Sequence, residues 1–243
     1  MNADTQTTVI HNVQSTPFGL VAGLGVGAGV FYYRSLVNAH LARSLSPSIV
    51  MVHANVQVVM GLANAHESHQ LADYLVGLLG QLAGAGAQVA SIPAFSPQIC
   101  AEELEERTPL PLIGLLDTIA REVKRRELTR VAVFGARVTI ETALFGRLRN
   151  LADVISPRPH EVDEITSIYG EIVRNEKASA SEFEALRMLA HALMLREHLD
   201  AILLAGTDFS FVFNPENADF PNLDGARVHI DAIMDRLTLR QNC

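Results

Sequence analysis

Two stretches of this chain end an apolar run with small residues, a hydroxyl residue and the start of a helix. The first is Val89-Ala-Ser-Ile-Pro-Ala-Phe-Ser96 and the second is Ala201-Ile-Leu-Leu-Ala-Gly-Thr-Asp208. In parallel sheets such turns lie at the carboxyl edge, where free backbone N–H groups hold anions. The hydroxyls of Ser96 and Thr207 either add hydrogen bonds to a carboxylate or serve only as helix N-caps. The pair predicts two similar lobes with one anionic ligand between them.

A glycine-rich segment, Gly23-Leu-Gly-Val-Gly-Ala28, follows the first apolar run and formally matches the dinucleotide fingerprint G-x-G-x-x-G/A. Ribose binding requires an acidic residue after the second strand, which ends instead in Val52-His53-Ala54. We therefore expect no nicotinamide cofactor. The favoured interpretation is a tight glycine turn that lines a cleft near Gly25.

Histidine and cysteine residues offer two further kinds of chemistry. His66 and His69 could share a metal ion, but no third ligand is evident and the spacing is not H-E-x-x-H, so we expect a solvated helix start and no metal. Cys100 falls in the second turn of a predicted helix, where the helix field lowers a thiol pKa only modestly, which favours an inert buried thiol. Cys243 is the last residue and is not expected to be a catalyst.

Alternating strands and helices must position these residues. Strands are predicted at residues 18–22, 49–52, 88–92, near Pro111, at 130–134 and at 201–204. Helices are predicted over residues 30–45, along the leucine stripe from Leu71 to Leu82, over 97–106, over 115–126, and from a capping box at Ser179 to Glu197. Repeated strand–helix alternation predicts an α/β fold of parallel sheets with helices on both faces.

The composition excludes several classes of protein. The chain has 243 residues, a formal net charge of −8 and a hydrophobic share of 49%. Its basic residues are scattered, which argues against nucleic acid, and no apolar run reaches the roughly 18–20 residues of a membrane span. Residues 1–17 lack the regions of a signal peptide and are expected to form a flexible arm. Two cysteines fit a reducing compartment, so we expect a cytoplasmic protein.

From about residue 18 to residue 237, the order of segments resembles the aspartate/glutamate/hydantoin racemase superfamily. The matching segments are Gly23-Leu-Gly-Val-Gly27, Phe31-Tyr-Tyr-Arg-Ser-Leu36, Gly84-Ala-Gly-Ala-Gln-Val-Ala-Ser-Ile-Pro93, Val131-Ala-Val-Phe-Gly-Ala-Arg-Val-Thr139, Pro159-His-Glu-Val-Asp-Glu-Ile165 and Leu223-Asp-Gly-Ala-Arg-Val-His229. The resemblance implies a pseudo-symmetric two-lobed α/β fold with a cofactor-free site between the lobes. Residues 18–114 and 209–243 would form one lobe and residues 115–208 the other, with a homodimer as the candidate assembly.

Both acid/base positions of that family are altered here. In typical members a cysteine from each lobe flanks the substrate Cα, one removing a proton and the other returning one. The first motif, usually C-N-T-x-H, reads Ala94-Phe-Ser-Pro-Gln98, and the second, usually G-C-T-E, reads Ala205-Gly-Thr-Asp208. Ala94 and Gly206 thus replace the cysteines, and losing a positioned base costs about 10²–10⁴ in rate. We expect no useful racemisation of aspartate or glutamate.

The resemblance leaves a ligand site with altered chemistry. Thr139 keeps a third hydroxyl position, and Asp208, His229 and His53 are the candidate acids and bases. Gly25, Ala94, Phe95, Ser96, Thr139, Gly206 and Thr207 are expected to contact the substrate. Our first hypothesis is an isomerase, lyase or cyclase that acts on a small carboxylate or acyl substrate by electrostatic positioning. The alternatives are a catalytically inactive small-molecule-binding or scaffold protein and, third, a racemase with substitute bases. Phe95 in place of Asn predicts a ligand more hydrophobic than aspartate, with a single carboxylate or carbonyl.

Overall fold

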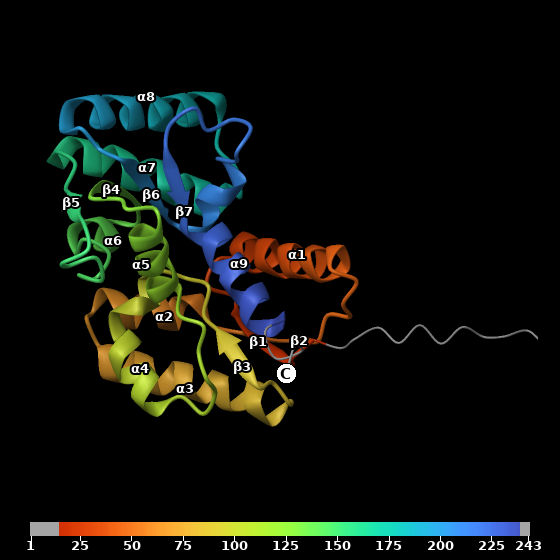
Figure 1. Cartoon of the computed structure of the whole chain (residues 1–243). Helices are drawn as coiled ribbons and strands as arrows, with labels where there is room; N and C mark the ends of the chain where they lie inside the picture. The colour runs from red at the N-terminus through yellow and green to blue at the C-terminus, as the bar shows by residue number, and fades with distance from the viewer. Residues whose placement is uncertain (1–14, 239–243) are drawn as a thin grey trace, which may run out of the picture.

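Two parallel sheets form the centres of two α/β lobes in the computed structural model, which describes residues 15–238 (Figure 1). The first sheet has the order β2-β1-β3, and its strands are β1 (Phe18–Ala22), β2 (Ile49–His53) and β3 (Val89–Ser91). The second has the order β5-β4-β6-β7, and its strands are β4 (Arg130–Gly135), β5 (Asp153–Ile155), β6 (Ala201–Ala205) and β7 (Asn222–Asp224). All of these pairings are parallel, which confirms the predicted α/β class.

Helices connect the strands and cover the sheets. Those before residue 110 are α1 (Val26–Ala42), α2 (Val56–Asn64), α3 (Ser68–Gly84), the 3₁₀ helix η1 (Ser96–Cys100) and α4 (Ala101–Arg107). The later ones are α5 (Leu115–Arg125), α6 (Arg137–Glu141), α7 (Pro159–Asn175), α8 (Ala180–Glu197), the 3₁₀ helix η2 (Thr207–Phe211) and α9 (Gly225–Thr238). Within residues 15–238, none of these helices combines the length and the apolar character that a membrane crossing requires.

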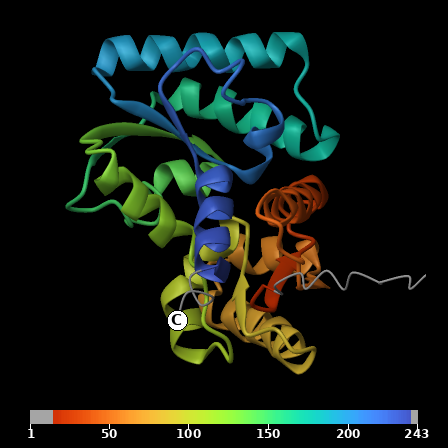
Figure 2. The same ribbon diagram turned by 45° about the vertical axis from the view of Figure 1, so that its right-hand side comes forward.

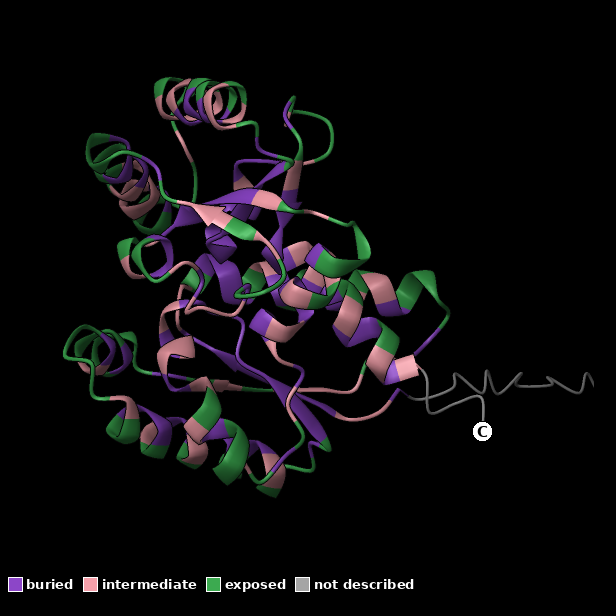
Figure 3. Cartoon of the chain, turned by 60° about the vertical axis from the view of Figure 1, so that its left-hand side comes forward, coloured by how far each residue is buried: buried purple, intermediate pink, exposed green. Residues whose placement is uncertain are grey.

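Strand β1 is buried on both faces, as expected of a central parallel strand. Phe18 and Leu20 pack into a cluster with residues of α1 and α9, whereas Val21 packs into a separate cluster with α2, α3 and α4. The alternation follows from the two-residue period of a strand. Figure 3 shows the same pattern in both lobes, with buried strands enclosed by helices that expose their outer faces.

The C-terminal segment joins the lobes, which corrects part of the predicted boundary. Residues 209–243 were expected in lobe one, but β7 pairs with β6 in the second sheet, and Leu223 is buried in the second-lobe core. A three-residue strand is too short to show a periodicity, so no hydrophobic pattern indicated β7. Helix α9 then descends to the first lobe and packs against α1 and α5 (Figure 2).

Several predicted elements are confirmed and others are displaced. The leucine stripe faces the core from α3, and the capping box at Ser179 begins α8. Helix α1 begins at Val26, four residues earlier than expected, and Gly27 in its first turn fits closely against Phe211. The predicted strand near Pro111 is only an isolated bridge from Ala90 to Leu112. The predicted arm lies outside the described residues up to position 14, whereas Ser15 is buried.

Candidate functional site

A cavity of about 370 Å³ lies between the lobes, at the carboxyl ends of the central strands. Both sequence-predicted turns contribute to its walls. Its first-lobe residues are Leu24, Val56, Val59, Met60, Ala94, Phe95, Ser96 and Pro97. Its second-lobe residues are Ala136, Arg137, Thr166, Tyr169, Gly170, Val173, Arg174, Ala205, Thr207 and Asp208. The volume suits a small molecule, and its position is that of ligand sites in open parallel sheets.

The first-lobe wall follows β3 and carries no ionisable side chain. Ala94 and Phe95 are buried, and the hydroxyl of Ser96 is the polar side-chain group beside them. The Gln98 side-chain amide donates a 2.9 Å hydrogen bond to the Ala94 carbonyl, which holds the turn in place. A side chain that could exchange a proton with a ligand is therefore absent among residues 94–97.

The ring of Phe95 reaches into the core of the second lobe, and the residue also lines the cavity. It belongs to the same buried cluster as Ile119 and Leu223. A β-carbon placed on Gly225 would lie 2.9 Å from its Cζ atom, so the ring tip meets the first residue of α9. Phe95 thus both lines the cavity and packs between the lobes.

The second-lobe wall carries a buried carboxyl group, Asp208. Its Oδ2 accepts hydrogen bonds of 3.3 Å from the hydroxyl of Tyr169 and 3.4 Å from that of Thr207. Its Oδ1 is buried and has no hydrogen-bond partner. Burial raises the pKa of Asp208 above its ordinary value, and the charge of Glu176 acts in the same direction. The carboxyl group therefore holds a proton more readily than an exposed aspartate, as a general acid or base requires.

Two arginines complete this wall. Arg137 forms ion pairs with Glu141 and Asp163, and Arg174 forms one with Glu171. Both guanidinium side chains are about half exposed or more, so they mark the mouth of the cavity rather than its floor. They place positive charge where a ligand carboxylate can enter.

His229 lies outside the cavity lining and is completely buried beneath it. Its Nε2–H donates to the Ile113 carbonyl at 2.8 Å, which leaves Nδ1 to accept from the Tyr32 hydroxyl at 3.1 Å. Burial lowers the pKa of His229 to about 4, so the ring is neutral. We assign no acid/base role to His229, because both nitrogens already have partners inside the protein.

The remaining predicted residues lie around the cavity rather than in its lining. His53 is exposed at the end of β2. Thr139 is fully buried on α6, and its hydroxyl has no partner. A β-carbon on Gly25 would lie 3.6 Å from both carboxylate oxygens of Asp208, so the glycine turn does approach the site. Gly206 lies directly behind the ring of Tyr169.

Sequence reasoning missed Tyr169, Arg137 and Arg174. Arg137 follows β4 at the carboxyl edge of the second sheet, so the rule that located Ser96 could have found it. Tyr169 and Arg174 lie on α7, and no local pattern shows which of its side chains reach the cavity.

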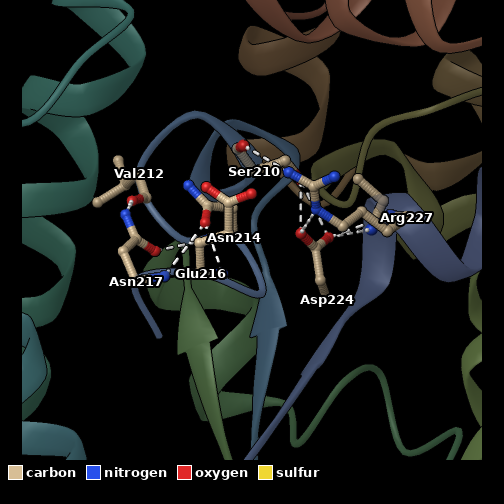
Figure 4. A network of polar contacts seen from close by, with 8 residues as sticks. Ser210, Val212, Asn214, Glu216, Asn217, Asp224 and Arg227 are labelled. Carbon is tan, nitrogen blue, oxygen red and sulfur yellow. Dashed lines mark hydrogen bonds and ion pairs between the residues drawn. The ribbon is translucent and has the colours of Figure 1, made fainter. Parts of the chain in front are cut away.

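The segment after Asp208 is fixed by a polar network (Figure 4). The hydroxyl of Ser210 donates to both oxygens of Asp224, at 2.9 and 3.0 Å. Asp224 also accepts from the backbone N–H groups of Ala226 and Arg227 and so caps α9. This network ties η2 to the start of α9 and restricts the second-lobe wall.

The cysteine and histidine interpretations have structural outcomes as well. Cys100 is buried and reduced, and burial raises the pKa of its thiol to about 12. Cys243 lies outside the described residues. His69 makes ion-pair contacts with Asp73 and Glu103 on the surface. Across residues 15–238, no three His, Cys, Asp or Glu side chains are grouped so that they could hold a metal ion.

Comparison with known proteins places this architecture. The sequence profile of the Asp/Glu/hydantoin racemase family matches residues 21–233. The chain belongs to the Asp/Glu/hydantoin racemase family. A Yersinia pestis structure described as an Asp/Glu racemase is similar over 91% of this chain and 99% of its own length, with 22% sequence identity and a TM-score of 0.80. The structure of an aspartate racemase homologue from Pyrococcus horikoshii is similar over 92% of this chain and 99% of its own length, with 17% sequence identity and a TM-score of 0.76. Glutamate racemase from Francisella tularensis, solved with D-glutamate, matches 93% of this chain and 82% of its own length at 13% identity, with a TM-score of 0.60. These racemase-family structures share the two-lobed α/β fold.

Proposed function

We propose that this racemase-family protein is an enzyme that transfers a proton at one face of a small carboxylate substrate, with Asp208 as the acid/base. The observation that carries the proposal is the asymmetry of the cavity. One wall presents a buried carboxyl group with an unpartnered oxygen, and the wall formed by residues 94–97 presents none. Two-sided proton transfer needs a carrier on each wall, so the chemistry is limited to one face of the Cα.

The proposed substrate has one carboxylate and an apolar substituent. The hydroxyls of Ser96 and Thr207 and the cations at the mouth suit a carboxylate group. Val56, Met60 and Val173 line the remaining space with apolar surface. The D-glutamate bound to the Francisella tularensis neighbour supports a carboxylate as ligand, whereas the apolar lining favours a side chain more hydrophobic than that of glutamate or aspartate.

The proposed step conserves atoms and charge. The ionised carboxylate of Asp208 takes the proton from the substrate Cα and becomes a carboxylic acid, while the electron pair of the C–H bond passes into the substrate carboxylate. Return of a proton to the same face regenerates the substrate with its configuration retained. Departure of a leaving group from the neighbouring carbon would instead complete a lyase reaction. Both outcomes begin with removal of one proton from Cα, and return of a solvent-derived proton to that carbon gives hydrogen exchange.

Exchange without inversion is therefore the test. Each enantiomer of alanine, norvaline, phenylalanine and 2-phenylpropionate is incubated with the protein in D₂O, and Cα deuteration is followed by NMR while chiral chromatography measures inversion. We expect deuteration of one enantiomer at least tenfold faster than inversion. Aspartate and glutamate should not racemise at enzyme-like rates.

Two variants make the test specific. Asp208→Asn should abolish exchange, because the amide cannot accept the proton. Asp231→Asn is the matched control: burial also raises the pKa of Asp231, but this residue lies outside the cavity lining, so exchange should persist. Inversion as fast as exchange would contradict one-faced transfer. Binding without exchange for every compound would favour the second candidate function, a catalytically inactive small-molecule-binding protein.

A further inference from the structure

We propose that Tyr169 is the specificity-determining residue of this cavity: its phenol fills the space that Gly206 leaves open, limits the size of the ligand substituent and offers a hydroxyl donor beside Asp208. The proposal rests on the proposed function, because it takes the interlobe cavity as the ligand site. It concerns a residue of α7 whose place at the cavity depends on a glycine 37 positions later in the chain.

The glycine at position 206 is explained by the ring and not by its own backbone. Gly206 has φ −141° and ψ 119°, an extended conformation that any residue adopts. A β-carbon at this position would lie 2.3 Å from Cε2, 2.5 Å from Cζ and 2.8 Å from the hydroxyl oxygen of Tyr169. Atoms do not approach so closely, so any side chain at position 206 would displace the phenol.

The phenol is held by contacts on two further sides. Its ring packs against that of Phe209, with centroids 4.9 Å apart and a tilt of 38°. Its hydroxyl donates to Oδ2 of Asp208 at 3.3 Å. Burial raises the pKa of Tyr169 well above its ordinary value, as does the charge of Asp208, so the hydroxyl stays protonated and acts as a donor. Contacts with Gly206, Phe209 and Asp208 hold the ring in the cavity wall, and a ring held there limits the size of the ligand.

Replacement of the ring should therefore change which ligands fit. Tyr169→Ala opens space for about one aromatic ring. Burial of an aromatic group is worth about 1.5–3 kcal/mol, or roughly 10–100-fold in affinity. Tyr169→Leu serves the same purpose with a smaller loss of packing should the alanine variant unfold. Tyr169→Phe keeps the ring and removes only the donor, so it should weaken all ligands about fivefold without changing their order.

The experiment measures dissociation constants by calorimetry for 2-methylbutyrate, 2-phenylpropionate and 2-(1-naphthyl)propionate. For Tyr169→Ala or Tyr169→Leu, we expect the affinity for 2-(1-naphthyl)propionate, divided by the affinity for 2-methylbutyrate, to rise at least tenfold. Gly206→Ala should weaken binding more than tenfold in the wild-type background and less than twofold in the Tyr169→Ala background. In the second background the phenol that the new methyl group would displace is already gone. Gly77→Ala is the matched control, since a β-carbon at Gly77 meets no atom within 4 Å.

An unchanged affinity ratio in both Tyr169 variants, or the same loss for Gly206→Ala in both backgrounds, would overturn the proposal. The outcomes for the two proposals are distinguishable because binding is measured without turnover. A shifted ratio without Cα exchange would refute only the proposed reaction, and exchange with an unshifted ratio would refute only the role of Tyr169. Failure of all three compounds to bind the wild-type protein would overturn the role of Tyr169 as a specificity determinant.

Discussion

Acidification should destabilise this protein through His229, whose ring is buried in the neutral form. The folded protein keeps the ring neutral down to a pKa of about 4, whereas histidine in an unfolded chain has a pKa of about 6.5. Between these two values the unfolded state binds a proton that the folded state does not. The free energy of unfolding therefore falls as the pH is lowered through this window and is fully retained above it.

The magnitude follows from the two pKa values. Each factor of ten between the proton affinities is worth about 1.4 kcal/mol, so the full loss is about 3 kcal/mol, of which about 2 kcal/mol is lost between pH 7 and pH 4.5. The groups facing the ring do not reverse the effect of burial: the hydrogen bond to the Ile113 carbonyl raises the pKa of His229 only in part, the charge of Arg121 lowers it, and Tyr32 is neutral. The pKa values of Asp208 and Asp224 are raised by burial, so these two residues make the folded protein more stable as the pH falls. They do so in the wild type and in the His229 variant alike, so their effect cancels in the comparison.

A difference measurement isolates this residue. Urea unfolding followed by circular dichroism at pH 7, 6, 5 and 4.5 compares the wild type with His229→Gln, which keeps a polar side chain but does not titrate. The variant should be less stable at pH 7, and the gap should narrow by about 2 kcal/mol at pH 4.5. Parallel curves for wild type and His229→Gln would refute the reasoning.

Three further substitutions or modifications test the packing and the chemistry outside the cavity. Gly225→Ala should lower the free energy of unfolding, measured with urea, by about 1–3 kcal/mol, because the new methyl group meets Phe95. Adding Phe95→Leu to this variant should recover part of the loss. If the double variant instead loses the sum of the two single losses, the two residues are not in contact. In a Cys243→Ser background, Cys100 should react with iodoacetamide at pH 8 only after unfolding, because a thiol with a pKa of about 12 is ionised in about one molecule in 10⁴; rapid alkylation of the folded protein would show that the thiol is accessible. Ser179→Ala should cost about 1 kcal/mol by removal of the N-cap of α8, measured as a lower urea midpoint, and an unchanged midpoint would mean that the capping box contributes nothing.

The sequence was most informative where structure is local. The leucine stripe of α3 and the capping box of α8 depend on residues within a few turns of one helix, so their spacing predicts them. The apolar runs at residues 130–134 and 201–204 predicted strands of a parallel sheet, and β4 and β6 are parallel strands of the second sheet. Because each turn lies at the carboxyl edge of its own parallel sheet, and the resemblance to the racemase superfamily implies a site between two lobes, Ser96 and Thr207 could also be expected at one cavity.

Sequence alone thus determined the α/β class, the order of most elements, and the two turns that meet at the cavity. Tertiary structure alone decided which side chains reach that cavity. Tyr169 lies beside Asp208 because α7 packs over the turn after β6, and His229 is enclosed because α9 crosses to α1. The direction of a side chain depends on packing between segments far apart in the chain, and residue spacing within one segment does not contain that information. Tertiary contacts, rather than residue type, therefore place Asp208 in the cavity with an unpartnered oxygen and leave His229 outside the lining with both nitrogens hydrogen-bonded.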